Sequence, residues 1–187
     1  TDLLGEKPAG ELAQGNDTDT AMVTTLLGAG EANNLFDSAL KLFSDLQGAF
    51  SFVFMDENTL YAARDRFGVR PLVLGRLARG WVVASEQPAL ATVGATYIRE
   101  IKPGQLIAID DSGVRSETFA TPNPAGCIFE YVYLARPDAT MSGRNVYESR
   151  VEMGRQLARE NKADADVVIP VPESGTPAAV GYAEESG

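Results

Sequence analysis

Residues 48–86 constrain the fold of this chain more than any other stretch, because they hold four short apolar runs separated by turn-forming residues. Short apolar runs bounded by Gly, Pro, Asp and Asn are typical of antiparallel strands. We therefore predict an antiparallel sheet, with a tight turn after the first run and another after the third. The four runs cover residues 49–55, 60–63, 72–75 and 81–84.

The link between the second and third runs, residues 64–71, is dense in charge for its length. It carries three arginines, one aspartate, one glycine and one proline. Charged side chains on an exposed loop usually add little to stability. We interpret the link as a structural turn with an ion pair, in preference to a binding site.

Composition excludes several classes of function. The net charge of -10 argues against a nucleic-acid partner or an anionic membrane surface, since both require clustered Lys and Arg. No apolar stretch approaches the roughly 20 residues that span a bilayer, and no signal-peptide pattern is present. The single cysteine permits no internal disulfide, which favours a cytoplasmic location. The absence of histidine excludes a Ser-His-Asp or Cys-His catalyst within this chain.

The regions on either side of the four runs predict helices and further strands. A polar stretch at residues 16–19 precedes an apolar face and marks a helix N-terminus, and residues 35–46 repeat apolar side chains at helical spacing. After the fourth run, Ser85 is the expected cap of a helix over residues 87–93. Three short strands are predicted next, over residues 98–101, 105–109 and 114–119.

A change of composition at residues 121–126 predicts a linker, because two prolines and a glycine fall within six positions. We therefore divide the chain into two domains, residues 1–120 and residues 121–187. With a length of 187 residues, a single domain plus part of a second is the expected organisation.

Beyond the linker, Asn145 and Glu148 resemble a capping box for a helix that ends near Asn161. Residues 166–172 then form an apolar run, typical of a strand buried on both faces. A small polar loop follows, and Pro177 falls in the first turn of a second helix. This order predicts the start of a parallel α/β domain, in which such loops bind ligands.

Three places carry side chains suited to chemistry, each with a structural alternative. Asp17 either caps a helix or holds a substrate ammonium group. Cys127 is either a buried small hydrophobe beside Ile128 and Phe129 or one thiolate ligand of a metal centre. The polar loop is the strongest candidate, because its glycine allows close backbone approach and the following helix N-terminus favours an anion. This candidate phosphate loop consists of Glu173, Ser174, Gly175 and Thr176.

Two sets of residues resemble known families. Residues 64–72 with residues 83–86 are similar to the signature of class II glutamine amidotransferases, which use an N-terminal cysteine nucleophile. Residues 127–138 with residues 171–175 resemble the narrower family of glutamine phosphoribosylpyrophosphate amidotransferases, also called amidophosphoribosyltransferases, of an actinobacterial type. The similarity covers nearly the whole chain from Asn16 onward.

The resemblance implies a fold class of α+β followed by α/β. Residues 1–120 would be part of an N-terminal-nucleophile αββα glutaminase sandwich with antiparallel sheets. Residues 121–187 would begin a type I phosphoribosyltransferase domain with a parallel sheet. One half of such an enzyme releases ammonia from glutamine, and the other passes it to phosphoribosylpyrophosphate to give 5-phosphoribosylamine, the committed start of purine synthesis.

The same resemblance implies roles for individual residues. Asp17 would bind the amino group of glutamine, and the candidate phosphate loop would bind phosphoribosylpyrophosphate, with Ser174 also reaching Mg²⁺. Cys127 matches the first cysteine of a [4Fe-4S] cluster that one branch of the family carries. Purine nucleotide inhibitors and assembly into a homo-oligomer, a dimer or a tetramer, are further expectations.

The chain also departs from the family pattern. It begins with Thr1 in place of the cysteine nucleophile, and we reject Thr1 as a nucleophile because the family has used much of its glutaminase domain before the Asp17 helix. No catalytic residue is expected in this segment, which alone should be inactive. One alternative is another class II amidotransferase, such as a synthetase using aspartate or a sugar phosphate. A second is a non-catalytic module that binds a nucleotide or partner subunit through exposed apolar surface.

Overall fold

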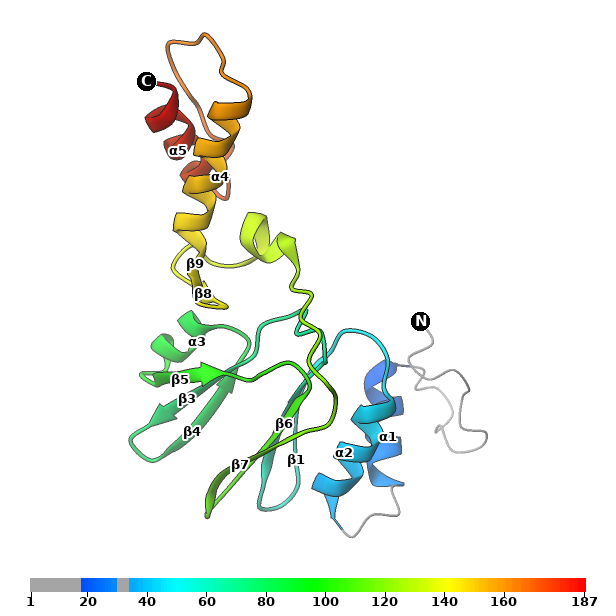
Figure 1. The fold of residues 1–187 in the computed structure, drawn as a ribbon. Coiled ribbons are helices and arrows are strands. Elements are labelled where there is room, and N and C mark those ends of the chain that lie inside the picture. Colours follow the sequence, from blue (N-terminus) through cyan, green and yellow to red (C-terminus); the bar gives the residue numbers. More distant parts are fainter. Residues whose placement is uncertain (1–17, 30–33) are drawn as a thin grey trace. The chain divides into compact units, whose positions relative to one another are not determined.

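The computed structural model describes residues 18–29 and 34–187, which form two compact units (Figure 1). Unit 1 contains the described residues up to Leu74 together with Arg99–Gly126, and unit 2 contains Gly75–Ile98 together with Cys127–Gly187. Within these described residues, no helix is both long enough and apolar enough to cross a membrane. The division of the chain into domains after residue 120 stays a prediction.

Unit 1 is built on a four-stranded antiparallel sheet in the order β1-β2-β6-β7. Every neighbouring pair is antiparallel, with Phe52 of β1 opposite Ala63 of β2 and Ala63 opposite Leu106 of β6. The runs predicted over residues 49–55 and 60–63 are therefore confirmed as antiparallel strands, whereas the runs over residues 72–75 and 81–84 lie in a second sheet instead of this one. The strands and helices of unit 1 are α1 (Asp19–Gly28), α2 (Leu35–Asp45), β1 (Ser51–Met55), β2 (Leu60–Arg64), β6 (Gln105–Asp110) and β7 (Gly113–Thr118).

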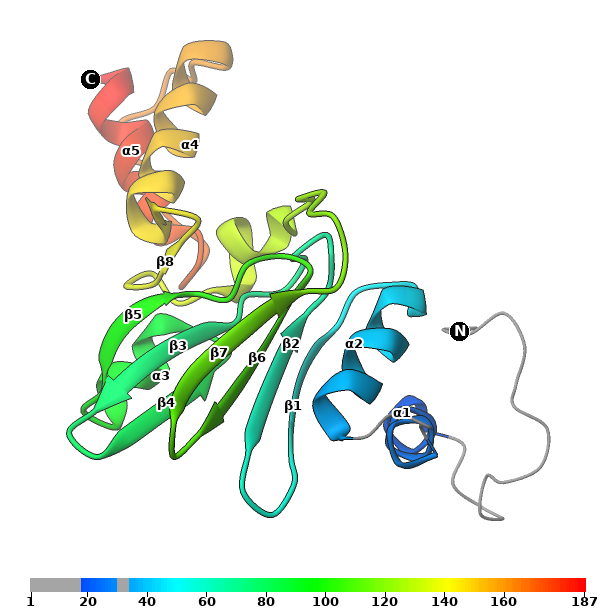
Figure 2. The ribbon, with the colours of Figure 1, turned by 60° about the horizontal axis from the view of Figure 1, so that its bottom comes forward.

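The core of unit 1 is a cluster of aromatic rings contributed by α2 and the sheet. Figure 2 shows α2 beside β1 of that sheet. The ring of Phe43 on α2 lies 5.5 Å from that of Phe50 and 5.8 Å from that of Phe119, measured between centroids. Phe43 and Phe50 are almost wholly buried. Because α2 presents its apolar residues at helical spacing, burying that one face against the sheet removes most of its apolar area from water.

Unit 2 contains shorter elements and one closely packed helix pair, α4 and α5. A second sheet has the order β4-β3-β5, and its strands β3 (Val73–Leu77) and β5 (Thr96–Glu100) cross the boundary between the units. The prediction that Ser85 caps α3 is wrong, because Glu86 is the N-cap. The Glu86 side chain makes no capping hydrogen bond. The other elements are β4 (Gly80–Ala84), α3 (Gln87–Thr92), the π-helix η1 (Glu130–Leu134), β8 (Thr140–Met141), β9 (Arg144–Asn145), α4 (Val146–Glu160) and α5 (Thr176–Ser186).

The strand predicted over residues 166–172 is wrong. The segment connects α4 to α5 without regular structure, and Val167, Ile169 and Val171 are 69%, 82% and 83% exposed. A strand needs a neighbour to accept and donate its backbone hydrogen bonds. In the described part of the chain, no strand pairs with this segment. The nearest preceding strands in the sequence, β8 and β9, pair with each other. The predicted parallel sheet is therefore not present in this chain.

The link at residues 64–71 is held by the buried guanidinium of Arg64, which is 6% exposed. Its Nε donates to the Arg70 carbonyl at 2.9 Å, and one terminal nitrogen donates to the Gly68 carbonyl at 3.0 Å. The other terminal nitrogen donates to the Ile101 carbonyl at 2.8 Å and lies 3.3 Å from the Glu100 carboxylate. The charge of Arg64 is thus satisfied by three carbonyls and one carboxylate.

The neighbouring Asp65 is fully buried and fixes the start of β1 to the same link. Its carboxylate accepts hydrogen bonds from the Phe50 amide at 3.2 Å and the Phe67 amide at 2.8 Å. The structural role predicted for the link is therefore supported. The expectation that its charged side chains lie on an exposed loop is wrong for Arg64 and Asp65, because backbone groups provide their partners inside the unit.

We expect Arg64→Met to destabilise the protein by about 3–5 kcal/mol, because it leaves the buried carbonyls of Gly68 and Ile101 without their hydrogen-bond donor. Urea denaturation measures the change. The matched control is Arg76→Met, since Arg76 is exposed, donates one bond to the Gly80 carbonyl and lies over Trp81. That control should cost about 1 kcal/mol or less. Equal losses for the two variants would contradict the role assigned to Arg64.

Candidate functional site

The candidate phosphate loop is a tight turn directly before α5. The Gly175 amide donates to the Val171 carbonyl at 3.2 Å, and the Thr176 amide donates to the Glu173 carbonyl at 3.1 Å. Helix α5 starts at Thr176 and has Pro177 in its first turn, as predicted. The backbone of the loop is therefore ordered by its own hydrogen bonds.

The side chains of the loop face solvent. Glu173 and Thr176 are exposed and Ser174 is partly exposed. The first amides of a helix lack partners within the helix, and the helix dipole makes this end attractive to anions. Two hydroxyls beside such a helix end are suited to phosphate oxygens.

Helix α4 begins as its sequence predicts. The Asn145 side chain accepts a hydrogen bond from the Glu148 amide at 3.0 Å, and the helix ends at Glu160, one residue before the predicted end. In Figures 1 and 2, α4 and α5 lie side by side and run in the same direction. The helix that follows the candidate phosphate loop is thus supported along its length by α4.

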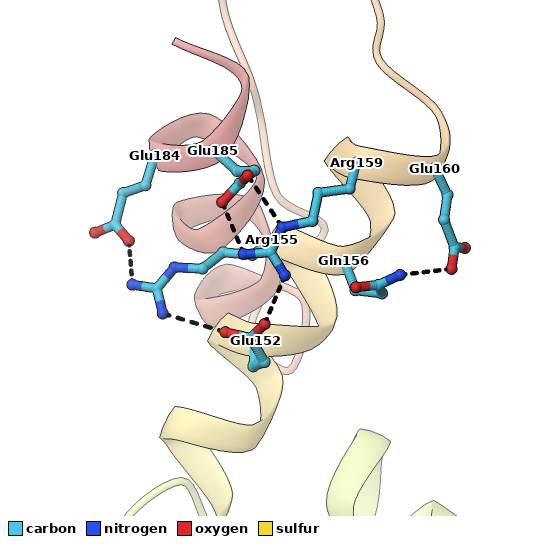
Figure 3. Close-up of polar contacts among 7 residues, drawn as sticks. All are labelled: Glu152, Arg155, Gln156, Arg159, Glu160, Glu184 and Glu185. Carbon is cyan, nitrogen blue, oxygen red and sulfur yellow. Dashed lines mark hydrogen bonds and ion pairs between the residues drawn. The ribbon is translucent and has the colours of Figure 1, made fainter.

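A ladder of ion pairs joins the exposed sides of α4 and α5 (Figure 3). Arg155 lies 2.7 Å from Glu184 and 3.4 Å from Glu152. Arg159 lies 3.0 Å from Glu185 and 3.1 Å from Glu152. The hydrogen bond from Arg159 lowers the pKa of Glu185, so this contribution to stability is present at neutral pH and is lost as the pH falls through the lowered pKa. Such exposed pairs stabilise only weakly.

Cys127 is a half-buried free thiol just before the short helical segment η1. Its carbonyl accepts a hydrogen bond from the Glu130 amide at 3.1 Å. Its neighbours Ile128 and Phe129 are 61% and 62% exposed. The structural alternative for Cys127, a buried hydrophobe packed beside these two residues, is therefore wrong.

The segment after Cys127 is anchored to α4 by Arg150, whose side chain is almost completely buried. The Arg150 guanidinium donates to the Tyr131 carbonyl at 2.6 Å and to the Ala135 carbonyl at 2.9 Å. Burial lowers the pKa of Arg150 from its ordinary value. The hydroxyl of Tyr131 also donates to the Met141 carbonyl at 2.8 Å, so η1 is held on two sides.

The metal sites implied by the family differ in how well these residues fit them. Among the described residues, no group of three or more His, Cys, Asp or Glu side chains could hold a metal ion. A [4Fe-4S] cluster needs four thiolates, and the chain contains only Cys127. Mg²⁺ is different, because it is commonly held by few protein ligands together with substrate phosphates. The oxygen donors of Ser174 and Glu173 fit that second arrangement.

Two cavities lie away from the candidate phosphate loop. In unit 2, a hollow of about 570 Å³ is lined by the first turns of α4 and by Arg144. In unit 1, a recess of about 500 Å³ is lined by Phe43, Phe67 and Phe119. The candidate phosphate loop lines neither of these two cavities, and its Glu173 and Thr176 side chains are exposed.

Asp17, the residue predicted to bind glutamine, lies outside the described residues. The helix predicted to follow it is confirmed as α1. Thr18 is the N-cap of α1, and the Thr18 hydroxyl accepts a hydrogen bond from the Ala21 amide at 3.2 Å. The nearest described carboxylate is that of Asp19, which is exposed in the first turn of α1. Asp19 belongs to the polar stretch at residues 16–19 that marks this helix N-terminus, and its carboxylate is a second candidate beside that of Asp17.

Comparison with known proteins gives close matches along the chain. A family model described as a glutamine amidotransferase domain matches residues 6–92. The amidophosphoribosyltransferase of Mycobacterium bovis is 62% identical over 171 residues, which is 91% of this chain and 32% of that protein. Over the segment it spans, the chain is therefore similar to amidophosphoribosyltransferases. The Bacillus subtilis member is 41% identical over 91% of this chain and 36% of its own length.

The structural comparison agrees with the sequence comparison. The solved structure of Bacillus subtilis glutamine phosphoribosylpyrophosphate amidotransferase, complexed with ADP and GMP, superposes with a TM-score of 0.90 at 40% identity. That superposition covers 95% of this chain and 39% of the other chain. The resemblance to an actinobacterial type is also confirmed, since the mycobacterial identity exceeds that of the Bacillus subtilis member. The chain spans about a third of the length of the curated relatives it matches.

We expect Gly175→Ala to destabilise the protein by about 1–3 kcal/mol, because an added methyl group has to displace a neighbour in a tightly packed turn. A Cβ at Gly175 would lie 2.7 Å from the Val171 carbonyl oxygen. Gly126→Ala is the matched control, since a Cβ there would meet nothing within 4 Å. Urea denaturation should show little change for the control. A loss at Gly126 equal to that at Gly175 would show that the turn is not sterically restricted.

Proposed function

We propose that this segment is part of a glutamine-dependent amidophosphoribosyltransferase, which catalyses the first step of de novo purine biosynthesis. The observation that carries the proposal is the 62% identity to a mycobacterial amidophosphoribosyltransferase over 91% of this chain. The match covers 171 of the 187 residues, more than either unit alone contains, so it runs through both units.

The proposed reaction has two steps. In the first, water hydrolyses the side-chain amide of glutamine and releases glutamate and ammonia. In the second, the ammonia nitrogen forms a bond to C1 of phosphoribosylpyrophosphate while the bond from C1 to the diphosphate oxygen breaks. The attacking nitrogen then loses a proton, which leaves 5-phosphoribosylamine and free diphosphate.

The residues of this chain would serve binding rather than bond making. Asp17 would accept a charge-assisted hydrogen bond from the ammonium group of glutamine. The Ala178 amide in the first turn of α5 and the hydroxyls of Ser174 and Thr176 would bind the diphosphate, with Gly175 giving the turn its shape. Glu173 stands at the exposed edge of the same loop, where it can contact the cation that accompanies the substrate.

Mg²⁺ is the proposed cofactor, with Ser174 as one of its ligands. When bound, it neutralises negative charge that develops on the departing diphosphate. An iron-sulfur cluster is a separate proposal for a longer protein: Cys127 would be one ligand, and three more thiolates would have to come from residues outside this chain.

Purine nucleotides are the proposed inhibitors, because the Bacillus subtilis relative was solved in complex with ADP and GMP. A homo-oligomer and a cytoplasmic location complete the proposal. The large exposed apolar side chains of η1 and its surroundings agree with burial against further protein, since such surfaces are seldom left open to solvent.

We expect a full-length protein carrying this segment to convert phosphoribosylpyrophosphate to 5-phosphoribosylamine with glutamine and Mg²⁺, while the 187-residue chain alone releases no glutamate. Glutamate and diphosphate release are measured for both proteins. Glutamate release that depends on aspartate or on a sugar phosphate as acceptor would favour another class II amidotransferase instead. Tight nucleotide binding without any turnover would favour a non-catalytic module.

Asp17→Asn in the full-length protein should raise the KM for glutamine by about tenfold or more, the effect of losing one charge-assisted hydrogen bond. Activity with ammonium chloride as the nitrogen donor should stay unchanged, because it bypasses the glutamine pocket. Asp19→Asn is measured beside it. An effect confined to Asp19→Asn would overturn the assignment to Asp17 and leave the glutamine-binding helix start in place.

A further inference from the structure

The closest approach between α4 and α5 lies at two glycines. A Cβ on Gly154 would overlap the carbonyl oxygen of Ala178 and would lie 2.7 Å from its carbonyl carbon. A Cβ on Gly181 would overlap the carbonyl oxygen of Val151 in the same way. The two backbones are therefore in contact at both points, and neither position can accept a side chain without movement of a helix.

The contact at Gly154 falls on the first turn of α5. Ala178 is the third residue of that helix, and the candidate phosphate loop ends at Thr176. Because the overlapping atoms belong to backbone, no side-chain rotation can relieve the clash. An added methyl group would displace the first turn of α5 and the loop attached to it.

We propose that Gly154 is a positioning residue for phosphoribosylpyrophosphate binding: it lets the first turn of α5, with the candidate phosphate loop, lie where it can bind diphosphate. The inference rests on the proposed function. Hydrogen bonds from amides weaken steeply with distance and angle, so a binding constellation has to be held to within about 0.5 Å. A glycine contact sets such a position through atoms that cannot rotate away.

Other contacts between the helices are less able to set this position. The ion pairs of Figure 3 connect exposed side chains, which move with little cost. The Tyr182 hydroxyl donates to the Asn161 carbonyl and accepts from the Ala163 amide, both at 2.8 Å, but it acts near the far end of α5. The Gly154 contact, in contrast, bears directly on the first turn of α5.

The test uses the full-length protein and compares Gly154→Ala with Tyr182→Phe. Both variants should lower Tm, but Gly154→Ala alone should also raise the KM for phosphoribosylpyrophosphate, by about tenfold, with little change in kcat. A rise in KM with little change in kcat is expected because the loop holds the diphosphate equally in the ground state and the transition state. The KM for glutamine should stay unchanged in both variants.

An unchanged KM for phosphoribosylpyrophosphate in Gly154→Ala would overturn the inference, as would an equal rise in Tyr182→Phe. If Gly154→Ala does not fold, Gly181→Ala displaces the same helix and is judged by the same two criteria. Wild-type protein that shows no turnover with phosphoribosylpyrophosphate would refute the proposed function itself, so the two failures are distinguishable.

Discussion

The antiparallel sheet of unit 1 depends on a buried guanidinium. Arg64 donates to three backbone carbonyls, and the adjacent Asp65 accepts from two backbone amides. The two side chains thus provide hydrogen-bond partners for backbone groups of an irregular turn inside the unit. A turn without a sheet neighbour has unpaired backbone groups, and burying them unpaired is costly. Arginine is suited to this task because its planar fork donates in several directions while remaining charged.

Unit 2 uses the same chemistry at another irregular segment. Arg150 donates to two carbonyls around η1, where the π-helical path leaves carbonyls without ordinary helical partners. The candidate phosphate loop is held differently, by a turn closed through Gly175 and by the contact of its helix with Gly154. Water can replace the hydrogen bonds of an arginine side chain when a loop opens. A backbone contact at a glycine instead fixes the distance between the two helices. A rigid cradle is what recognition of a small, highly charged group requires.

Local sequence patterns predicted most elements because their causes are local. Apolar runs between turn residues predicted β1 and β2, and the side chains of Asn145 and Glu148 predicted where α4 begins. The failures have non-local causes. Residues 166–172 have the composition of a buried strand, but a strand exists only where another strand pairs with it. The burial of Arg64 likewise follows from carbonyls brought in from residue 101, far along the chain.

The candidate site was predictable only in part, for a related reason. The candidate phosphate loop could be read from its glycine, its hydroxyls and the helix start that follows, all within a few residues. The role of Gly154 could not be read, because a glycine inside a helix indicates only lower helical propensity until the neighbouring helix is known. The strand predicted at residues 166–172 failed for the same kind of reason, because a strand depends on a pairing partner that a local apolar run does not reveal.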